Sequence, residues 1–199
     1  MTTRSLILHD YEVRAALDGR LGLVVRPVKP QPTMIQDMVE PEGYDMVPSW
    51  DGKTELHMSK CPLGVPGDRL VCKETWCNTW PFTKEKCPDG PCYKETDEGE
   101  CGAYRTGQRW RSPATMPAWA SRITLDVVGV RCVRVKELTE DDARACGFSW
   151  TGEPGQYGDG CQSPFSNFED AWNARYAKRG YAWDSNPWAW AVEVRRVEP

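Results

Sequence analysis

Apolar and polar residues alternate with the two-residue period of a β-strand in three parts of the chain. These are residues 69–76, 123–135 and 188–197. A fourth strand is predicted over residues 22–28, which are mainly apolar and are closed by Pro27 and Pro30. Gly129 interrupts the second of the alternating segments and predicts a bend or bulge there.

Three further segments have helical spacing, and each runs from an N-cap residue to a glycine that ends it. Val13, Ala16 and Leu17 share one face of the first helix. In the third, Phe168 and Trp172 begin a stripe at i, i+4 and i+8 that we expect in the core. The predicted N-caps and terminal glycines are Asp10 and Gly19, Thr139 and Gly147, and Ser166 and Gly180.

Residues 29–60 and 77–103 have few periodic positions and many turn-forming residues, so we interpret them as two long loop insertions. The 199 residues suit a single domain spanning 1–199. Four or more strands with three short helices predict an α+β fold built on a small curved sheet or β-barrel.

Charge and composition narrow the class of partner. The chain has 25 basic and 29 acidic side chains, a net charge of −4 and no basic block, which disfavours binding to long duplex DNA. No apolar run approaches the ~18 residues that a membrane span needs, and the N-terminal apolar run is too short for a signal peptide. We therefore expect a cytoplasmic protein whose partner is a nucleotide, a single strand or another protein.

The nine cysteines are expected to be mainly reduced in such a compartment. Cys77, Cys87, Cys92 and Cys101 lie in the second insertion and could together hold a structural zinc ion. Only the x4 spacing between Cys87 and Cys92 approaches the usual ligand pair, so unliganded thiols remain the alternative interpretation.

Charged residues at element boundaries suggest a binding pocket. Arg26 lies in a predicted apolar strand and needs a partner, and Glu74, on the inward face of another strand, is the predicted one. An arginine–carboxylate pair beside the indole of Trp76 would bind a planar polar group. A structural ion pair is the alternative. The full candidate set is Arg20, Arg26, Glu74, Trp76, Ser121 and Arg122.

Four segments carry a resemblance to a known family: Cys61 to Leu70, Lys73 to Trp76, Met116 to Ile123, and Trp183 to Trp188. Together they resemble phage and prophage proteins related to the ASCH domain of the PUA-like superfamily. The resemblance implies a small β-barrel with flanking short helices, and binding of RNA, nucleotides or modified bases.

The resemblance also implies what has been lost. ASCH hydrolases that remove an acetyl group from a cytidine amine use a Lys, a Thr and a Glu, and the matching positions here are Leu21, Val24 and Cys146. An amine, a hydroxyl and a carboxylate are thus replaced, so the resemblance transfers the pocket better than the reaction.

We therefore expect a phage-type, PUA-like domain that binds a nucleotide, a modified base or short single-stranded RNA without hydrolysing it. One alternative is an amidohydrolase or ribonuclease that uses a rearranged set such as Glu74 with Cys146. Another is a protein-interaction factor, with residues 29–60 and 77–103 forming a surface for a host defence or virion component.

Overall fold

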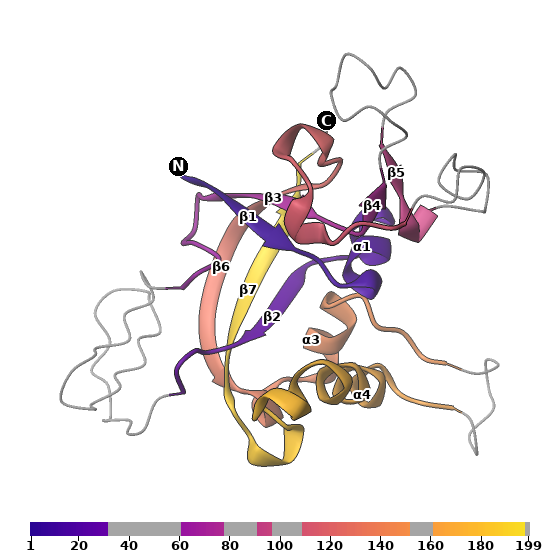
Figure 1. Cartoon of the computed structure of the whole chain (residues 1–199). Coiled ribbons are helices and arrows are strands. Elements are labelled where there is room, and N and C mark those ends of the chain that lie inside the picture. Colours follow the sequence, from indigo (N-terminus) through magenta and orange to yellow (C-terminus); the bar gives the residue numbers. More distant parts are fainter. Residues whose placement is uncertain (32–60, 78–90, 97–108, 152–160, 198–199) are drawn as a thin grey trace.

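The fold is α+β, with a mixed five-stranded sheet at its centre (Figure 1). The computed structural model describes residues 1–31, 61–77, 91–96, 109–151 and 161–197. Strand β1 is parallel to β3, and every other neighbouring pair is antiparallel. In spatial order the strands are β1 (Thr3–Ile7), β3 (Arg69–Lys73), β6 (Thr124–Arg134), β7 (Trp188–Arg196) and β2 (Leu23–Pro27).

Helix α1 (Asp10–Leu17) connects the two edge strands, and α3 (Glu140–Ala145) and α4 (Pro164–Tyr176) pack against each other below the sheet in Figure 1. Strands β4 (Trp76–Cys77) and β5 (Cys92–Tyr93) form a separate two-stranded sheet. No helix in the described ranges is long and apolar enough to cross a bilayer. The 3-10 turns are Lys94–Thr96 (η3), Pro113–Thr115 (η4), Ala118–Ala120 (η5), Val135–Glu137 (η6), Ala177–Arg179 (η7) and Trp183–Ser185 (η8).

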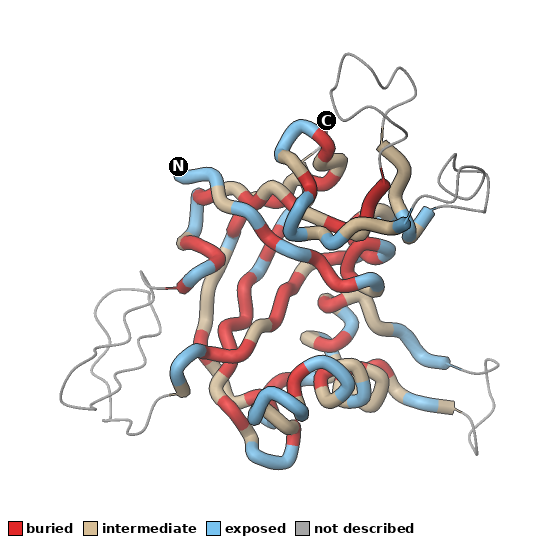
Figure 2. The backbone as a smooth tube through the Cα atoms, viewed as in Figure 1, coloured by how far each residue is buried: buried red, intermediate tan, exposed pale blue. Residues whose placement is uncertain are grey.

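Alternation along the strands divides the buried side chains into two main clusters. Figure 2 shows in red where the buried residues lie along the backbone. The first joins all five strands of the main sheet to α1, and includes Leu6, Val24, Leu70, Leu125 and Val192. The second joins the opposite face of β2 and β7 to α3 and α4, and includes Val25, Phe168, Trp172, Tyr176 and Ala191. The predicted aromatic stripe is confirmed as core.

Most predicted element boundaries agree with the structure, and the differences have local causes. His9, not Asp10, is the N-cap of α1. Ser163, not Ser166, is the N-cap of α4, because its hydroxyl accepts the Ser166 N–H and Pro164 fits the first helical position. The strand predicted over 69–76 ends at Lys73 and resumes as β4.

The two insertions lie largely outside the described residues, so the predicted interaction surface at 29–60 and 77–103 does too. The register shift between Val127 and Gly129 confirms the predicted irregularity in β6. Closure of the sheet into a barrel is not shown, because β1 and β2 each pair with a single strand within the described part of the chain. We call the space between these two edge strands the seam.

Candidate ligand-binding site

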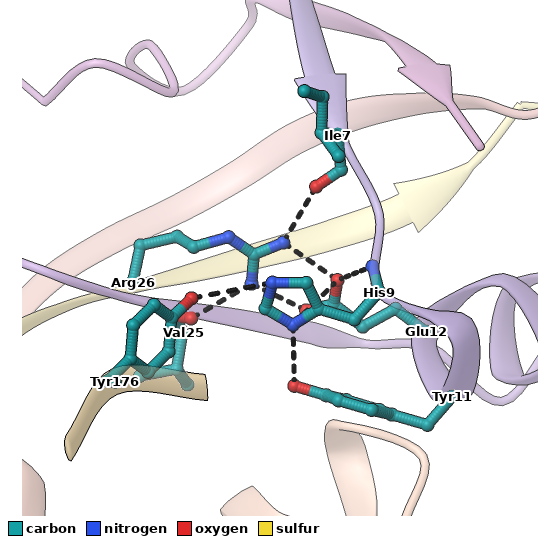
Figure 3. A network of polar contacts seen from close by, with 7 residues as sticks. All are labelled: Ile7, His9, Tyr11, Glu12, Val25, Arg26 and Tyr176. Atoms are coloured by element: carbon teal, nitrogen blue, oxygen red, sulfur yellow. Dashed lines mark hydrogen bonds and ion pairs between the residues drawn. The ribbon is translucent and has the colours of Figure 1, made fainter. Parts of the chain in front are cut away.

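A buried ion pair spans the seam. Arg26 projects from β2 and Glu12 from α1, and the guanidinium binds both carboxylate oxygens: Nη1 donates to Oε1 at 2.6 Å and Nη2 to Oε2 at 2.7 Å (Figure 3). The Glu12 side chain is 1% exposed and that of Arg26 is 14% exposed. Glu12 Oε2 also accepts the backbone N–H of His9 at 2.7 Å.

The same guanidinium connects the two edge strands. Nη2 donates to the carbonyl of Ile7 on β1 at 3.0 Å, and Nη1 donates to that of Val25 on β2 at 2.9 Å. Each terminal nitrogen of Arg26 thus makes two hydrogen bonds within the protein. The terminal donors of Arg26 are thus committed to contacts within the protein, and its role as a ligand contact stays a prediction.

The charges of this pair stabilise each other despite their burial. Burial alone would raise the pKa of Glu12, but the charge and hydrogen bonds of Arg26 outweigh it, and the pKa of this carboxyl is lowered. Burial works against the charged form of Arg26 too, and Glu12 outweighs it, so the pKa of the guanidinium is raised. Both groups are ionised at neutral pH.

His9 lies beside the ion pair, between two tyrosines. Its Nδ1 is 3.1 Å from the Tyr11 hydroxyl, and its Nε2 is 3.5 Å from the Tyr176 hydroxyl (Figure 3). Burial lowers the pKa of His9 to about 4, and the raising effect of the Glu12 carboxylate does not compensate. The imidazole is therefore neutral at pH 7.

A pocket of about 560 Å³ opens at the seam. Its wall combines apolar side chains with four cations and, among the described residues, includes neither Asp nor Glu, in a chain whose net charge is −4. Such a concentration of positive charge favours an anionic ligand. The lining residues are Ser5, Leu6, Ile7, His9, Arg26, Pro27, Lys29, Pro62, Leu63, Arg175, Tyr176, Arg179 and Trp190.

Three of the four cations can reach a ligand. Arg175 and Arg179 are exposed near the C-terminal end of α4, and within the described residues their side chains make no ion pair. Lys29 is exposed, with its ammonium 5.6 Å from the centroid of the Tyr181 ring. Cations at a helix C-terminus also stabilise the helix dipole. That effect explains why basic residues occur at the end of the helix, but not why they line the same pocket as Lys29.

The structure places Glu74 elsewhere, with a different partner. Arg122 donates to both of its carboxylate oxygens at 2.8 Å, so the predicted pairing of Arg26 with Glu74 is wrong. The Arg122 guanidinium stacks on Tyr93, 3.9 Å from the ring centroid, and bonds Thr96. This second ion pair attaches β5 and η3 to the start of β6 and lies outside the 560 Å³ pocket.

The other predicted residues also have structural contacts. The Trp76 indole is buried and its N–H donates to the Thr115 hydroxyl at 3.3 Å. The Ser121 hydroxyl donates to the carbonyl of Cys72 at 2.7 Å. Arg20 is exposed and bonds the Gly147 carbonyl and Asp18. Of the six predicted ligand residues, only Arg26 lines the pocket.

The predicted zinc set is not assembled in the described residues. Cys92 is disulfide-bonded, which removes the thiolate that the zinc hypothesis needs, and Cys77 is fully buried. Cys87 and Cys101 lie outside the described residues. The described part of the chain contains no group of three or more His, Cys, Asp or Glu side chains arranged for a metal ion.

The three positions that match the hydrolase residues are buried. Leu21 and Val24 belong to the sheet core and Cys146 to the cluster under α3 and α4. Burial raises the pKa of Cys146 well above its usual range, so its thiol stays protonated and is a poor nucleophile.

Glu12, His9 and the helix arginines are not among the residues predicted from the sequence. One signal was present: Glu12 lies three and four positions before Ala15 and Ala16, on the apolar face of the predicted helix. A carboxylate on such a face needs a buried partner, as Arg26 does on its strand. The two unpartnered charges could have been paired with each other.

No family model and no curated protein sequence matches the chain. Among solved structures, it is similar to a protein from Enterococcus faecalis V583 described with the family model DUF984, with 6% identity, a TM-score of 0.44, and coverage of 99% of this chain and 81% of that one. It is also similar to the ASCH domain from Lactobacillus crispatus JV V101, with 8% identity, a TM-score of 0.41, and coverage of 98% and 78%. Both TM-scores are below 0.5, so the function is inferred below from the residues of the pocket.

Proposed function

We propose that the chain binds a nucleotide, a modified base carried on a nucleotide, or short single-stranded RNA in the pocket at the seam, and does not hydrolyse it. The observation that carries this proposal is the pocket wall, where Lys29, Arg175 and Arg179 lie together with no carboxylate among the described lining residues. With the sequence resemblance, the proposal extends to a PUA-like protein of phage type that acts in the host cytoplasm.

The size and chemistry of the pocket suit a nucleotide. Its volume of about 560 Å³ is in the range of pockets that bind small organic ligands. Arginines bind phosphate oxygens through charge-assisted hydrogen bonds. The apolar part of the wall, which includes Leu63 and Trp190, offers surface to a base or sugar.

A second, shallower pocket supports a ligand longer than one nucleotide. It has a volume of about 290 Å³ and shares His9 and Arg175 with the first. A strand held at Arg175 by one phosphate could therefore place neighbouring units in both pockets. Its lining residues are His9, Asp10, Tyr11, Ala171, Ala174 and Arg175.

Removing the helix arginines tests the proposal. We expect the double variant Arg175→Ala, Arg179→Ala to bind ribonucleoside 5′-monophosphates at least about tenfold more weakly than the unaltered chain, since one charge-assisted bond contributes roughly 1.5–3 kcal/mol. Titration calorimetry at two salt concentrations measures the loss. Lys178→Ala is the matched control, because Lys178 is exposed between the two arginines but does not line the pocket. Equal affinities for all three proteins would contradict the proposal.

The absence of hydrolysis has its own test. We expect no turnover of N4-acetylcytidine, because Leu21 and Val24 supply neither an amine nor a hydroxyl and the Cys146 thiol is protonated. Chromatography of the nucleoside after long incubation would reveal any released cytidine. Turnover that disappears in Cys146→Ala would instead favour the hydrolase alternative.

A further inference from the structure

The backbone N–H and C=O groups of edge strand β1 point alternately towards β3 and towards the seam. The carbonyl of Thr2 accepts the N–H of Arg69, and the N–H of Leu8 donates to Lys73, so even-numbered residues of β1 bond to β3. In a parallel ladder the N–H and C=O groups of the residues between them face the other side. The Arg26 bond to the Ile7 carbonyl across the seam agrees with this register.

The facing edge of β2 offers fewer donors. The N–H of Val28 donates to Trp188 on β7, so the odd-numbered residues of β2 face the seam. The carbonyl of Val25 is bound by Arg26, and Pro27 has no N–H. Proline is tolerated on an edge strand because no ladder bond is lost there.

Backbone groups with no hydrogen-bond partner among the described residues therefore face the pocket on the β1 side. Ser5, Leu6 and Ile7 all line it, and the seam-facing groups among them are the N–H and C=O of Ser5 and the N–H of Ile7. The Ile7 carbonyl is occupied by Arg26. A donor at Ile7 and an acceptor at Ser5 thus follow each other along the open edge.

We propose that this edge of β1 binds the heterocyclic base of the ligand, with the Ser5 carbonyl accepting a base N–H and the Ile7 N–H donating to the neighbouring acceptor of the base. The inference rests on the proposed nucleotide-binding function and deepens it. Lys29, Arg175 and Arg179 then hold the phosphate, so base and phosphate are bound by different parts of one wall.

The ion pair limits what else this edge can accept. An added peptide strand would have to pass between β1 and β2, but the Arg26 side chain, rooted on β2, reaches the Ile7 carbonyl of β1 directly at 3.0 Å. The seam is closed to a strand at that level. A planar base needs only the two backbone groups at Ser5 and Ile7, and both residues line the pocket.

The ligand itself gives the first test, using the unaltered chain. Adenosine 5′-monophosphate is compared with its 1-methyl form, and uridine 5′-monophosphate with its 3-methyl form, by titration calorimetry. Ribose 5-phosphate, which has no base, is measured alongside them. We expect methylation of the base edge to weaken binding about tenfold, towards the level of ribose 5-phosphate, since the methyl group removes one of the two hydrogen bonds and its bulk keeps the other from forming. If methylation has no effect while the nucleotides still bind, the base assignment is overturned and the anion pocket stands. If no phosphate compound binds, the proposed function falls and the base assignment with it.

A pair of proline substitutions gives the second test. Ile7→Pro removes the proposed donor without removing a ladder bond, and should lower nucleotide affinity about tenfold while ribose 5-phosphate binding is unchanged. Thr3→Pro is the control, because Thr3 has the same seam-facing register but does not line the pocket. Equal nucleotide affinities for the two folded variants would contradict the proposal. The methylated nucleotides decide the matter if Ile7→Pro does not fold.

Discussion

Replacing Glu12 with alanine should lower the free energy of unfolding by about 3–5 kcal/mol, because it leaves the Arg26 guanidinium buried at the seam without its counter-ion. The loss has two parts. Two charge-assisted hydrogen bonds to Arg26 disappear. The backbone N–H of His9, the N-cap of α1, also loses its acceptor. Urea denaturation followed by tryptophan fluorescence measures the change.

Two comparisons separate this effect from the loss of any surface ion pair. Glu140→Ala removes a carboxylate from a half-exposed pair with Arg144, and should cost less than about 1 kcal/mol. The double variant Glu12→Leu, Arg26→Met removes both buried charges and should recover much of the stability that Glu12→Ala loses. A loss in Glu12→Ala no larger than in Glu140→Ala would refute the central role of the seam pair.

The elements that could be predicted from the sequence are those fixed by local pattern. The alternation in β7 and the stripe of Phe168, Trp172 and Tyr176 each require one buried face, whatever lies opposite. The N-cap of α4 was misplaced because Ser163 and Ser166 are both good caps, and the choice depends on Pro164 at the first helical position.

The candidate site was harder to predict because it is made by pairing across long sequence separations. The sequence marks Arg26 as a charge in an apolar strand, but its pattern does not separate Glu74, the predicted partner, from Glu12, the observed one. The partner of Arg26 is decided by α1, which places Glu12 beside the seam, and by Arg122, which forms an ion pair with Glu74. Arg175 and Arg179 look like ordinary helix-end cations until the fold brings them to β1 and β2.

The ion pair and the pocket depend on the same structural feature, which is the gap between two edge strands. The Arg26 hydrogen bond to Ile7 links the two edges, which share no backbone ladder within the described part of the chain. Beyond this bridge the β1 backbone and the helix arginines remain available to a ligand. The buried arginine is thus used for stability, and the exposed cations are left for binding.

Acidification should destabilise the fold through His9 before the carboxylates respond. The pKa of this imidazole is lowered from 6.5 to about 4, chiefly by burial, with the Arg26, Arg175 and Arg179 charges lowering it further and Glu12 opposing them. Between these two values the unfolded chain binds a proton that the folded chain does not, so stability falls as pH falls. The loss should reach about 3 kcal/mol by pH 4.

Because the pKa of Glu12 is lowered, the stability that its charge contributes is lost only at more acidic pH, where the carboxylate that balances Arg26 becomes protonated. Unfolding free energies measured from pH 7 to 5 therefore isolate the histidine. His9→Gln should remove most of the slope in that window, even if it lowers stability at pH 7, because glutamine does not titrate. His57→Gln, which changes the other histidine of the chain, should keep the slope. A slope that survives in His9→Gln would assign the acid sensitivity to another group and would mean that the imidazole between Tyr11 and Tyr176 is not held neutral.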